Sequence, residues 1–456
     1  MTFVNTNTNV KLIIGIGKTG ISCVRYFISL GYNIIVMDTR ITPPGIQDFK
    51  KLFPSVKLML GKIDLKNLEN IDEIIVSPGI SLSDPLIIEL LKYLNIAIKG
   101  DIELFANSTN VPIIAITGSN GKSTVTSLLG EMIKFSGKKV GIGGNLGTPS
   151  LDLLQIAEAN FYVLELSSFQ LELTNSLRAK AAVVLNITPD HMDRYRNLTE
   201  YINTKKKVYL NCEIAVINKD DDSGYKNLLL PEKKISFGIH NIEDSNFYLK
   251  NNWLMHRNNK LLHINNLKIK GMHNISNALA ALALGYAINL PLKSMLDTLI
   301  NFSGLPHRCQ LVTTINKIEF YNDSKGTNIG STKTVIESLG RNNAEKKIIL
   351  IAGGVGKNAD FSLLKSTIKK YVHTLVLIGQ DATVIAKNLD SSCNNIIFST
   401  TMQDAVRKCV KNAKPYDQIL LSPACASTDM FKNFEERGEA FIYEINKILN
   451  EKFFSK

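Results

Sequence analysis

The chain has 456 residues, of which 45% are hydrophobic and 21% charged. This length exceeds what one ordinary core can hold, and the composition is that of a soluble multidomain enzyme rather than a fibrous or disordered protein. The formal net charge of +12 comes from scattered Lys and Arg residues, which disfavours a nucleic-acid surface and fits anionic small substrates or simply A/T-rich codons.

The sequence indicates neither export nor membrane insertion. Residues 1–17 lack a basic segment followed by a long apolar stretch and a cleavage site. The most apolar long segment, Ile275 to Leu292, is Ala-rich and contains Asn277 and Asn289, which is typical of a buried helix. The six cysteines show no metal-binding or C-x-x-C spacing. We therefore expect a cytoplasmic protein with reduced thiols and no membrane partner.

Short apolar runs alternate with helical patterns along nearly the whole chain. Such a rhythm predicts α/β domains with mainly parallel sheets. The polar stretch 220–259 is interpreted as a loop-rich β insertion, and residues 312–321 as a β-hairpin. The predicted strands are 10–15, 33–37, 73–76, 113–117, 161–166, 181–186, 215–218, 347–352, 375–378 and 418–422.

Two breaks divide the chain. The first lies near Gly100, where residues 93–99 give way to GDIELF, and the second lies in SGLPHR, residues 303–308. They predict three domains. These are a Rossmann-like N-terminal domain (1–100), a P-loop ATPase-like central domain with a parallel sheet (101–304) and a Rossmann-like C-terminal domain (305–456).

A glycine-rich turn follows the first predicted strand. Gly15, Gly17 and Gly20 are spaced as in dinucleotide-binding folds, and Asp38 ends the next strand. Taken alone, this motif indicates a dehydrogenase, but the same turn cradles the diphosphate of any nucleotide, including a UDP-sugar. Residues 77–79, Ser-Pro-Gly, end another strand and should lie at the same carboxyl edge of the sheet.

Residues 113–124 read IIAITGSNGKST, an apolar strand, a glycine-bracketed loop and the start of an amphipathic helix. Gly118 and Gly121 allow backbone N–H groups to point at phosphate oxygens, Lys122 brings a charge, and Ser123 offers a hydroxyl to Mg²⁺. The common pattern has glycine where Ile116 stands, so this is a variant loop. An ordinary turn entering a helix is the alternative, but the coincidence of these features favours a nucleoside triphosphate.

Two further polar groups follow predicted strands of the central domain. Glu165 ends the run FYVLE, the usual place for a Mg²⁺ ligand beside a phosphate loop, although a solvated glutamate is the simpler alternative. Asp190, His191 and Asp193 lie in NITPDHMDRY, where a ligand or acid–base role and a structural role are equally compatible with the pattern. Residues 205–207 are three lysines in a predicted helix, and such a run is usually a solvated face.

Three strings of small and hydroxyl residues follow strands of the C-terminal domain. They are NDSKGTN (322–328), IAGGVGKNADF (351–361) and LSPACASTDMFKNFEERG (421–438). Loops of this composition bind anionic substrates closely, yet none of them identifies a reaction. Together with the two nucleotide motifs, they predict three ligands that meet between three domains.

These motifs together resemble the Mur ligase family from end to end, and the string 421–438 with SPG and DTR resembles its D-glutamate-adding branch. The resemblance implies an ATP-dependent amide ligase. ATP would phosphorylate the alanine carboxylate of UDP-N-acetylmuramoyl-L-alanine, and the amine of D-glutamate would then attack the acyl phosphate, releasing ADP and phosphate. A folylpolyglutamate synthase-like ligase, another amino-acid-adding Mur ligase and a non-catalytic nucleotide-binding module are the alternatives.

The resemblance also implies roles for single residues. Lys122 would stabilise the transferred phosphoryl group, Ser123 and Glu165 would hold one Mg²⁺ ion, and His191 with a carbamylated Lys205 would serve a second. The expected ATP-binding set is Gly118, Ser119, Asn120, Gly121, Lys122, Ser123, Thr124, Asn277, Arg308 and Asp323. The UDP-substrate set is Gly17, Thr19, Asp38, Thr39, Arg40, Ser77, Gly79, Asn145 and Gln170. The D-glutamate set is Thr327, Lys357, Ser427 and Phe434. The partners are small molecules only, and we expect a monomer.

Overall fold

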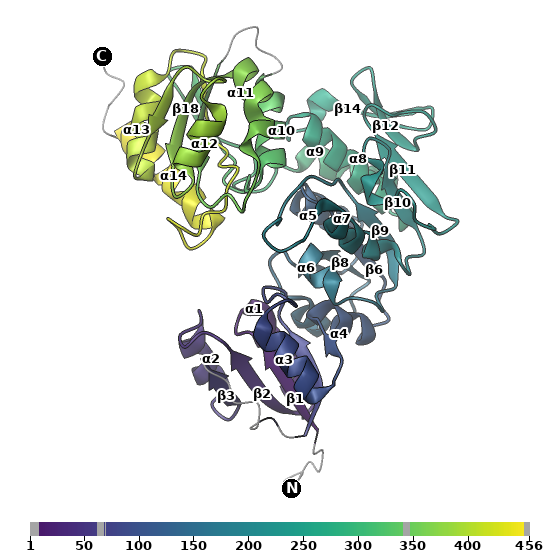
Figure 1. Cartoon of the computed structure of the whole chain (residues 1–456). Coiled ribbons are helices and arrows are strands. Elements are labelled where there is room, and N and C mark those ends of the chain that lie inside the picture. Colours follow the sequence, from purple (N-terminus) through teal and green to yellow (C-terminus); the bar gives the residue numbers. More distant parts are fainter. Residues whose placement is uncertain (1–8, 62–67, 69, 341–346, 451–456) are drawn as a thin grey trace.

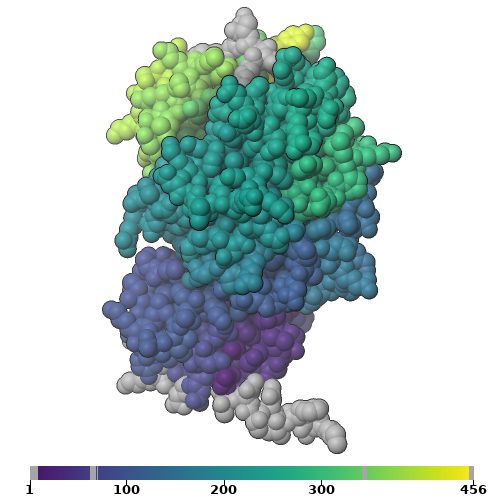
Figure 2. All heavy atoms as spheres, turned by 90° about the vertical axis from the view of Figure 1, so that its right-hand side faces the viewer, coloured from purple at the N-terminus to yellow at the C-terminus, as the bar shows by residue number. Residues whose placement is uncertain are grey.

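The computed structural model describes residues 9–61, 68, 70–340 and 347–450. Three β-sheets follow one another along the chain, and each is covered by helices (Figure 1). Figure 2, turned by 90°, shows the same order from one end of the molecule to the other, with the central domain in the middle. The predicted α/β fold in three domains is therefore confirmed, while the exact boundaries at residues 100 and 304 stay predictions.

The N-terminal domain is a five-stranded parallel sheet in the order β3-β2-β1-β4-β5. The strand order reverses beside β1, and ligands of open sheets bind at the carboxyl edge of such a point. There the Ser77 N–H donates to the Ile14 carbonyl (3.0 Å), so the loop after β4 lies against the loop after β1. The elements are β1 (Val10–Ile14), α1 (Lys18–Ser29), β2 (Asn33–Asp38), α2 (Ile46–Leu52), β3 (Lys57–Leu60), β4 (Ile71–Val76), α3 (Pro85–Leu94) and β5 (Ile98–Lys99).

The central domain is a nine-stranded sheet in the order β14-β13-β12-β11-β10-β9-β6-β8-β7. Strand β6, between β9 and β8, is buried along its whole length, as expected for a strand of a parallel sheet that is covered on both faces. The helices are α4 (Asp101–Asn107), α5 (Lys122–Phe135), α6 (Ser168–Glu172), α7 (Leu198–Lys206), α8 (Met272–Ala287) and α9 (Leu292–Asn301). The strands are β6 (Ile113–Thr117), β7 (Val140–Gly144), β8 (Phe161–Glu165), β9 (Ala179–Val184), β10 (Ala215–Asn218), β11 (Lys234–Gly238), β12 (Phe247–Lys250), β13 (Trp253–His256) and β14 (Asn259–His263).

The stretch 220–259 has the β character that the sequence suggested, and its strands extend the central sheet. Strand β11 pairs with β10 in parallel, and β12, β13 and β14 continue the sheet as an antiparallel meander. The strands have only four or five residues each, which is why their pattern is weak in the sequence.

The apolar segment 275–292 forms most of α8 and the turn that leads into α9. Helix α8 packs on α5, and Ala278, Leu279 and Leu282 are fully buried in this contact layer. The predicted buried helix is confirmed, although it ends at Ala287. Within the described residues, no helix has both the length and the apolar character needed to cross a membrane.

The C-terminal domain is a six-stranded sheet in the order β15-β16-β20-β17-β18-β19. Strands β15 and β16 form the predicted hairpin, and the other strands are parallel. The elements are β15 (Gln310–Ile315), β16 (Ile318–Asn322), α10 (Ile329–Gly340), β17 (Ile348–Gly353), α11 (Lys365–Tyr371), β18 (Val372–Ile378), α12 (Ala382–Leu389), β19 (Ile396–Phe398), α13 (Met402–Asn412), β20 (Gln418–Leu421) and α14 (Phe434–Asn450). The short 3₁₀ turn of this domain is η6 (Phe361–Leu364), and those of the central domain are η2 (Ser150–Gln155), η3 (Lys207–Tyr209), η4 (Asp222–Gly224) and η5 (Ile264–Asn266).

Replacing Gly20 with Ala should destabilise the N-terminal domain, because α1 lies directly against the loop after β1. A Cβ at residue 20 would sit 1.9 Å from the Gly15 carbonyl oxygen, an overlap that requires the helix to move. We expect a loss of about 1–3 kcal/mol, visible as an earlier first transition in thermal unfolding. The matched control is Gly17→Ala, whose Cβ would meet nothing within 4 Å. Equal unfolding of both variants would contradict this close approach.

Candidate active site

One cavity of about 1200 Å³ joins the three domains. It runs from the carboxyl edge of the N-terminal sheet, past the end of β8, to the start of α14. Among the predicted site residues, those that line it are Gly17, Thr19, Asp38, Thr39, Arg40, Ser77, Gly79, Ser123, Asn145, Glu165, Gln170, Arg308 and Phe434. The predicted residues outside its lining are Gly118, Ser119, Asn120, Gly121, Lys122, Thr124, His191, Lys205, Asn277, Asp323, Thr327, Lys357 and Ser427.

The N-terminal end of the cavity contains a buried carboxylate paired with an arginine. The guanidinium of Arg40 binds Asp38 through Nε (2.8 Å) and Nη2 (2.7 Å), and the Ile16 N–H donates to the same carboxylate (2.9 Å). Burial alone would raise the pKa of Asp38, but these hydrogen bonds hold it below its usual range. The two predicted UDP-substrate residues thus fix each other, with half of the Arg40 side chain exposed toward the cavity.

The amide of Gln170 is also held from both ends. Its Nε2 donates to Asp101 Oδ2 (3.0 Å), and its Oε1 accepts the Ser167 N–H (3.1 Å) in a capping box. Asp101 is fully buried, and burial raises the pKa of its carboxyl. The string GDIELF was identified in the sequence as a domain boundary, but the hydrogen bond from Gln170 to its aspartate, Asp101, was not predicted.

The phosphate loop between β6 and α5 has the predicted conformation. Gly118 and Gly121 have positive φ angles of 146° and 83°, which favour glycine. The Lys122 ammonium donates to the carbonyls of Gly118 and Ser119 (2.9 Å each), so it lies inside the curve of its own loop. Asn277 of α8 packs directly on Gly121, which brings this predicted ATP-binding residue to the loop.

Glu165 and Ser123 meet where β8 and α5 adjoin. The Ser123 hydroxyl donates to Glu165 Oε2 (2.5 Å), Asn145 Nδ2 donates to Oε1 (2.6 Å), and Arg308 of the C-terminal domain reaches Ser123 Oγ (2.5 Å). Burial opposes ionisation of Glu165, but Lys122 and Arg308 lower its pKa below the usual value. The site therefore offers an ionised carboxylate and a hydroxyl, both oxygen donors that suit Mg²⁺.

The described residues contain no cluster of three or more His, Cys, Asp or Glu side chains that could hold a metal ion. A Mg²⁺ ion at Glu165 and Ser123 would thus need further oxygen ligands. Mg²⁺ commonly takes these from substrate phosphates and water, so the donor set fits a nucleotide-bound ion rather than a permanent one.

Lys205 is the buried member of the lysine run. Its Nζ lies 3.0 Å from the Gly118 carbonyl oxygen and 4.7 Å from the centre of the Tyr201 ring, and only 2% of the residue is exposed. Burial and the neighbouring Lys122 lower the pKa of Lys205 well below its usual value. No carboxylate of the described chain lies within ion-pair distance of it. Interpreting the whole run as a solvated face was therefore wrong for this residue.

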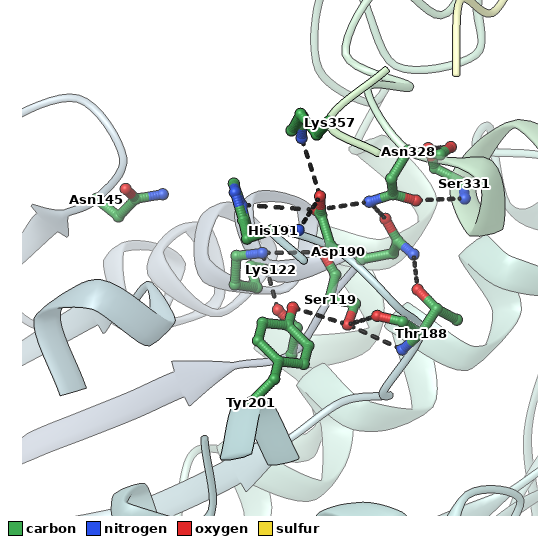
Figure 3. A network of polar contacts seen from close by, with 12 residues as sticks. Ser119, Lys122, Asn145, Thr188, Asp190, His191, Tyr201, Asn328, Ser331 and Lys357 are labelled. Carbon is green, nitrogen blue, oxygen red and sulfur yellow. Dashed lines mark hydrogen bonds and ion pairs between the residues drawn. The ribbon is translucent and has the colours of Figure 1, made fainter. Parts of the chain in front are cut away.

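Asp190 is one of the points where the C-terminal domain contacts the central one (Figure 3). It accepts from Lys357 Nζ (2.9 Å) and from Asn328 Nδ2 (3.0 Å), and Asn328 also donates to Asn120 of the phosphate loop (3.2 Å). Burial, outweighing Asp190, lowers the pKa of the adjacent His191 to about 4. This imidazole is therefore neutral at physiological pH, which is the form that binds metals.

Three loops of the C-terminal domain lie side by side and carry the remaining predicted residues. The Ala424 N–H donates to the Gly326 carbonyl (2.8 Å), and Val355 pairs with Ala426, so Thr327, Lys357 and Ser427 belong to adjoining loops. Phe434 opens α14, and Lys325 Nζ lies 3.8 Å from the centre of its ring. Burial lowers the pKa of Lys325 to about 8. The sequence analysis marked this string without singling out Lys325 or Asn328.

Asp323 is completely enclosed beside these loops. It accepts from the Cys309 N–H (3.0 Å) and the Ser422 hydroxyl (2.7 Å), while burial raises its pKa to about 7. Arg308 lies close enough to oppose that shift. Asp323 is thus next to the arginine that reaches the phosphate loop, but it does not line the cavity.

Comparisons with known proteins agree over nearly the whole chain. Residues 9–99 match the description "Mur ligase MurD-like, N-terminal domain", 116–285 match "Mur ligase middle domain", and 307–425 match "Mur ligase, glutamate ligase domain". The chain is 45% identical to the UDP-N-acetylmuramoylalanine–D-glutamate ligase of Coxiella burnetii (strain RSA 331 / Henzerling II), covering 96% of this chain and 98% of that one. The Pseudomonas aeruginosa PAO1 enzyme of the same name is 43% identical, with the same two coverages.

Solved structures support the same architecture. The UDP-N-acetylmuramate–alanine ligase MurC of Thermotoga maritima superposes with a TM-score of 0.60 over 98% of this chain and all of that one. The sequence identity between the two chains is only 17%, so this similarity concerns the fold alone.

The pH dependence of stability should reveal the protonated Asp323. The unfolded chain loses this proton near pH 4 and the folded chain near pH 7, so the wild-type protein loses stability as the pH rises through this window. Asp323→Asn removes the titration. We expect the stability of the variant relative to wild type to improve by about 2 kcal/mol between pH 5 and pH 8, measured by urea unfolding without nucleotide. A difference that is constant with pH would show that Asp323 is already ionised in the folded state.

Proposed function

Because this chain belongs to the Mur ligase family, we propose that it is the ligase that adds D-glutamate to UDP-N-acetylmuramoyl-L-alanine at the expense of ATP, in peptidoglycan synthesis. The observation that supports this most directly is the cavity shared by three domains. It connects the nucleotide loops at β1 and β4 with Glu165 and Ser123 beside the phosphate loop. A polyglutamate ligase would have no use for the nucleotide-binding domain at this end.

Each domain would bind one ligand. Residues 1–100 would hold the UDP end of the first substrate, with Thr19, Thr39, Arg40, Ser77 and Gly79 at the carboxyl edge of the sheet. Residues 101–304 would bind ATP, and residues 305–456 D-glutamate. Asn145 and Gln170 line the same cavity as Glu165, and they would position the alanine carboxylate.

The chemistry requires two anions, the γ-phosphate of ATP and the alanine carboxylate, to come together. Lys122, Arg308 and Lys325 supply positive charge close to Glu165, at the end of β8. Mg²⁺ held by Ser123 and Glu165 would neutralise phosphate charge when bound. The neutral imidazole of His191, with Lys205, would serve a second ion.

Lys205 is suited to become a carbamate. Carbamylation joins a neutral amine nitrogen to the carbon of CO₂ and releases one proton, so it needs an amine with a lowered pKa. Burial gives Lys205 this property, and the product would be an anion where an ammonium ion would repel a metal.

For D-glutamate, Lys357 would pair with one carboxylate, and Thr327, Ser427 and Phe434 would complete the site. Lys357 is free to do so only after it leaves Asp190, to which it is ion-paired. The acceptor amine would then approach the acyl phosphate beside Glu165. We further propose a cytoplasmic monomer without nucleic-acid or membrane partners.

Phosphate release by the purified protein tests the reaction. With ATP, Mg²⁺ and UDP-N-acetylmuramoyl-L-alanine, we expect turnover with D-glutamate but not with L-glutamate, L-lysine or diaminopimelate. Lys122→Ala should reduce it at least about 10²-fold, because a charge that stabilises the transferred group is lost. Turnover with another amino acid would reassign the enzyme within the family. Absence of turnover with all four, from a folded protein that binds ATP, would refute the proposal.

Dependence on CO₂ tests the state of Lys205. Wild-type turnover should fall in CO₂-depleted buffer and recover when bicarbonate is added, whereas Lys205→Arg should lose about 10²-fold or more under both conditions. Lys206→Arg is the matched control, because Lys206 is the more exposed neighbour and donates only to a backbone carbonyl. Full activity of Lys205→Arg would rule out a carbamate.

A further inference from the structure

Arg194, in the turn after β9, reaches from the central domain into the N-terminal domain. Its Nη1 donates to the Pro78 carbonyl (2.9 Å) and its Nη2 to the Ile80 carbonyl (3.1 Å). Both carbonyls belong to the loop after β4 that lines the cavity. One side chain therefore fixes two peptide groups of a loop in another domain.

The guanidinium is itself held in place by two further residues, Glu172 and Phe169. Glu172 accepts from its Nη2 (2.6 Å), and the Tyr195 hydroxyl donates to the other oxygen of Glu172 (2.6 Å). The Phe169 ring lies 4.0 Å below the guanidinium carbon. Arg194 and Glu172 are both largely buried, so the contacts are little weakened by solvent. Such a clamp defines the direction in which the arginine donates.

The two carbonyl contacts decide where the neighbouring N–H groups point. In a trans peptide the C=O and the N–H of one unit point in opposite directions. The Gly79 and Ser81 N–H groups therefore point away from Arg194, and both residues line the cavity. Within the described part of the chain neither N–H has a hydrogen-bond partner. Unpaired N–H groups beside a glycine-rich turn are suited to bind phosphate oxygens.

We propose that Arg194 is a positioning residue for the UDP substrate, which it never touches, and that it acts by orienting the Gly79 and Ser81 amides toward the substrate diphosphate. The inference rests on the proposed function, which assigns the nucleotide end of the substrate to this loop. It adds a link from the turn that carries Asp190 and His191 to the loop that receives the nucleotide.

Substitution of Arg194 should weaken one substrate selectively. For Arg194→Met we expect the Kd of UDP-N-acetylmuramoyl-L-alanine, measured by calorimetry, and its KM to rise about tenfold or more. The KM values for ATP and D-glutamate should stay within about twofold. Arg194→Lys should recover only part of the loss, because one ammonium group cannot reproduce the planar fork that reaches both carbonyls.

Arg25→Met is the matched control. Arg25 of α1 binds Asp152 across the same pair of domains but does not line the cavity. The Arg25→Met substitution should lower thermal stability without changing the Kd of the UDP substrate. An unchanged Kd in Arg194→Met, or a parallel rise in the KM for ATP, would overturn the inference while leaving the proposed function intact. If the wild-type protein did not bind the UDP substrate, the proposed function and the inference would fail together.

Discussion

An excess of buried positive charge is the constraint on which the site depends. Lys122, Arg308 and Lys325 are at least half buried around the phosphate loop, and Glu165 and Asp190 are among the carboxylates that offset them. Uncompensated charge is costly in a protein interior, and the lowered pKa values of the lysines express that cost. Bound phosphates would supply the missing negative charge. The unbalanced positive charge therefore lowers the stability of this region without ligands and raises its affinity for anions. Binding of phosphates would relieve the repulsion between the cations.

The parts of the fold that were predictable from the sequence are those encoded locally. The strand, glycines, lysine and amphipathic helix of residues 113–135 lie next to one another, so the phosphate loop could be identified directly. The meander β12–β14 was predicted only as a loop-rich β stretch, and its individual strands could not be placed because each has only four or five residues. Asn251 and Asn252, both with positive φ, carry the turn between its first two strands, and this pair is a hairpin signal that the polar composition obscured.

Long-range contacts of the site were not predictable in the same way. Lys357 and Asp190 are 167 positions apart, and Arg194 meets Pro78 across 116 positions. No periodicity encodes such pairs, because they depend on how separately folded domains meet. The buried position of Lys205 was predictable only in part, since its place on α7 follows from helical spacing but its depth follows from the loop after β6 that covers it. The family resemblance assigned it a role that the residue pattern alone did not.

The ion pair between Lys357 and Asp190 affects the apparent affinity of the proposed amino-acid site for its ligand. Under the proposed assignment, Asp190 is a tethered competitor whose local concentration far exceeds that of any free carboxylate. The apparent affinity for the amino acid is then the intrinsic affinity multiplied by the fraction of molecules in which the lysine is released. An incoming ligand with a single carboxylate can at best exchange one ion pair for another, whereas a dicarboxylate retains a second interaction that Asp190 cannot imitate. Discrimination between ligands with one and with two carboxylates would thus arise partly from the ion pair between Lys357 and Asp190, which must break before the ligand binds.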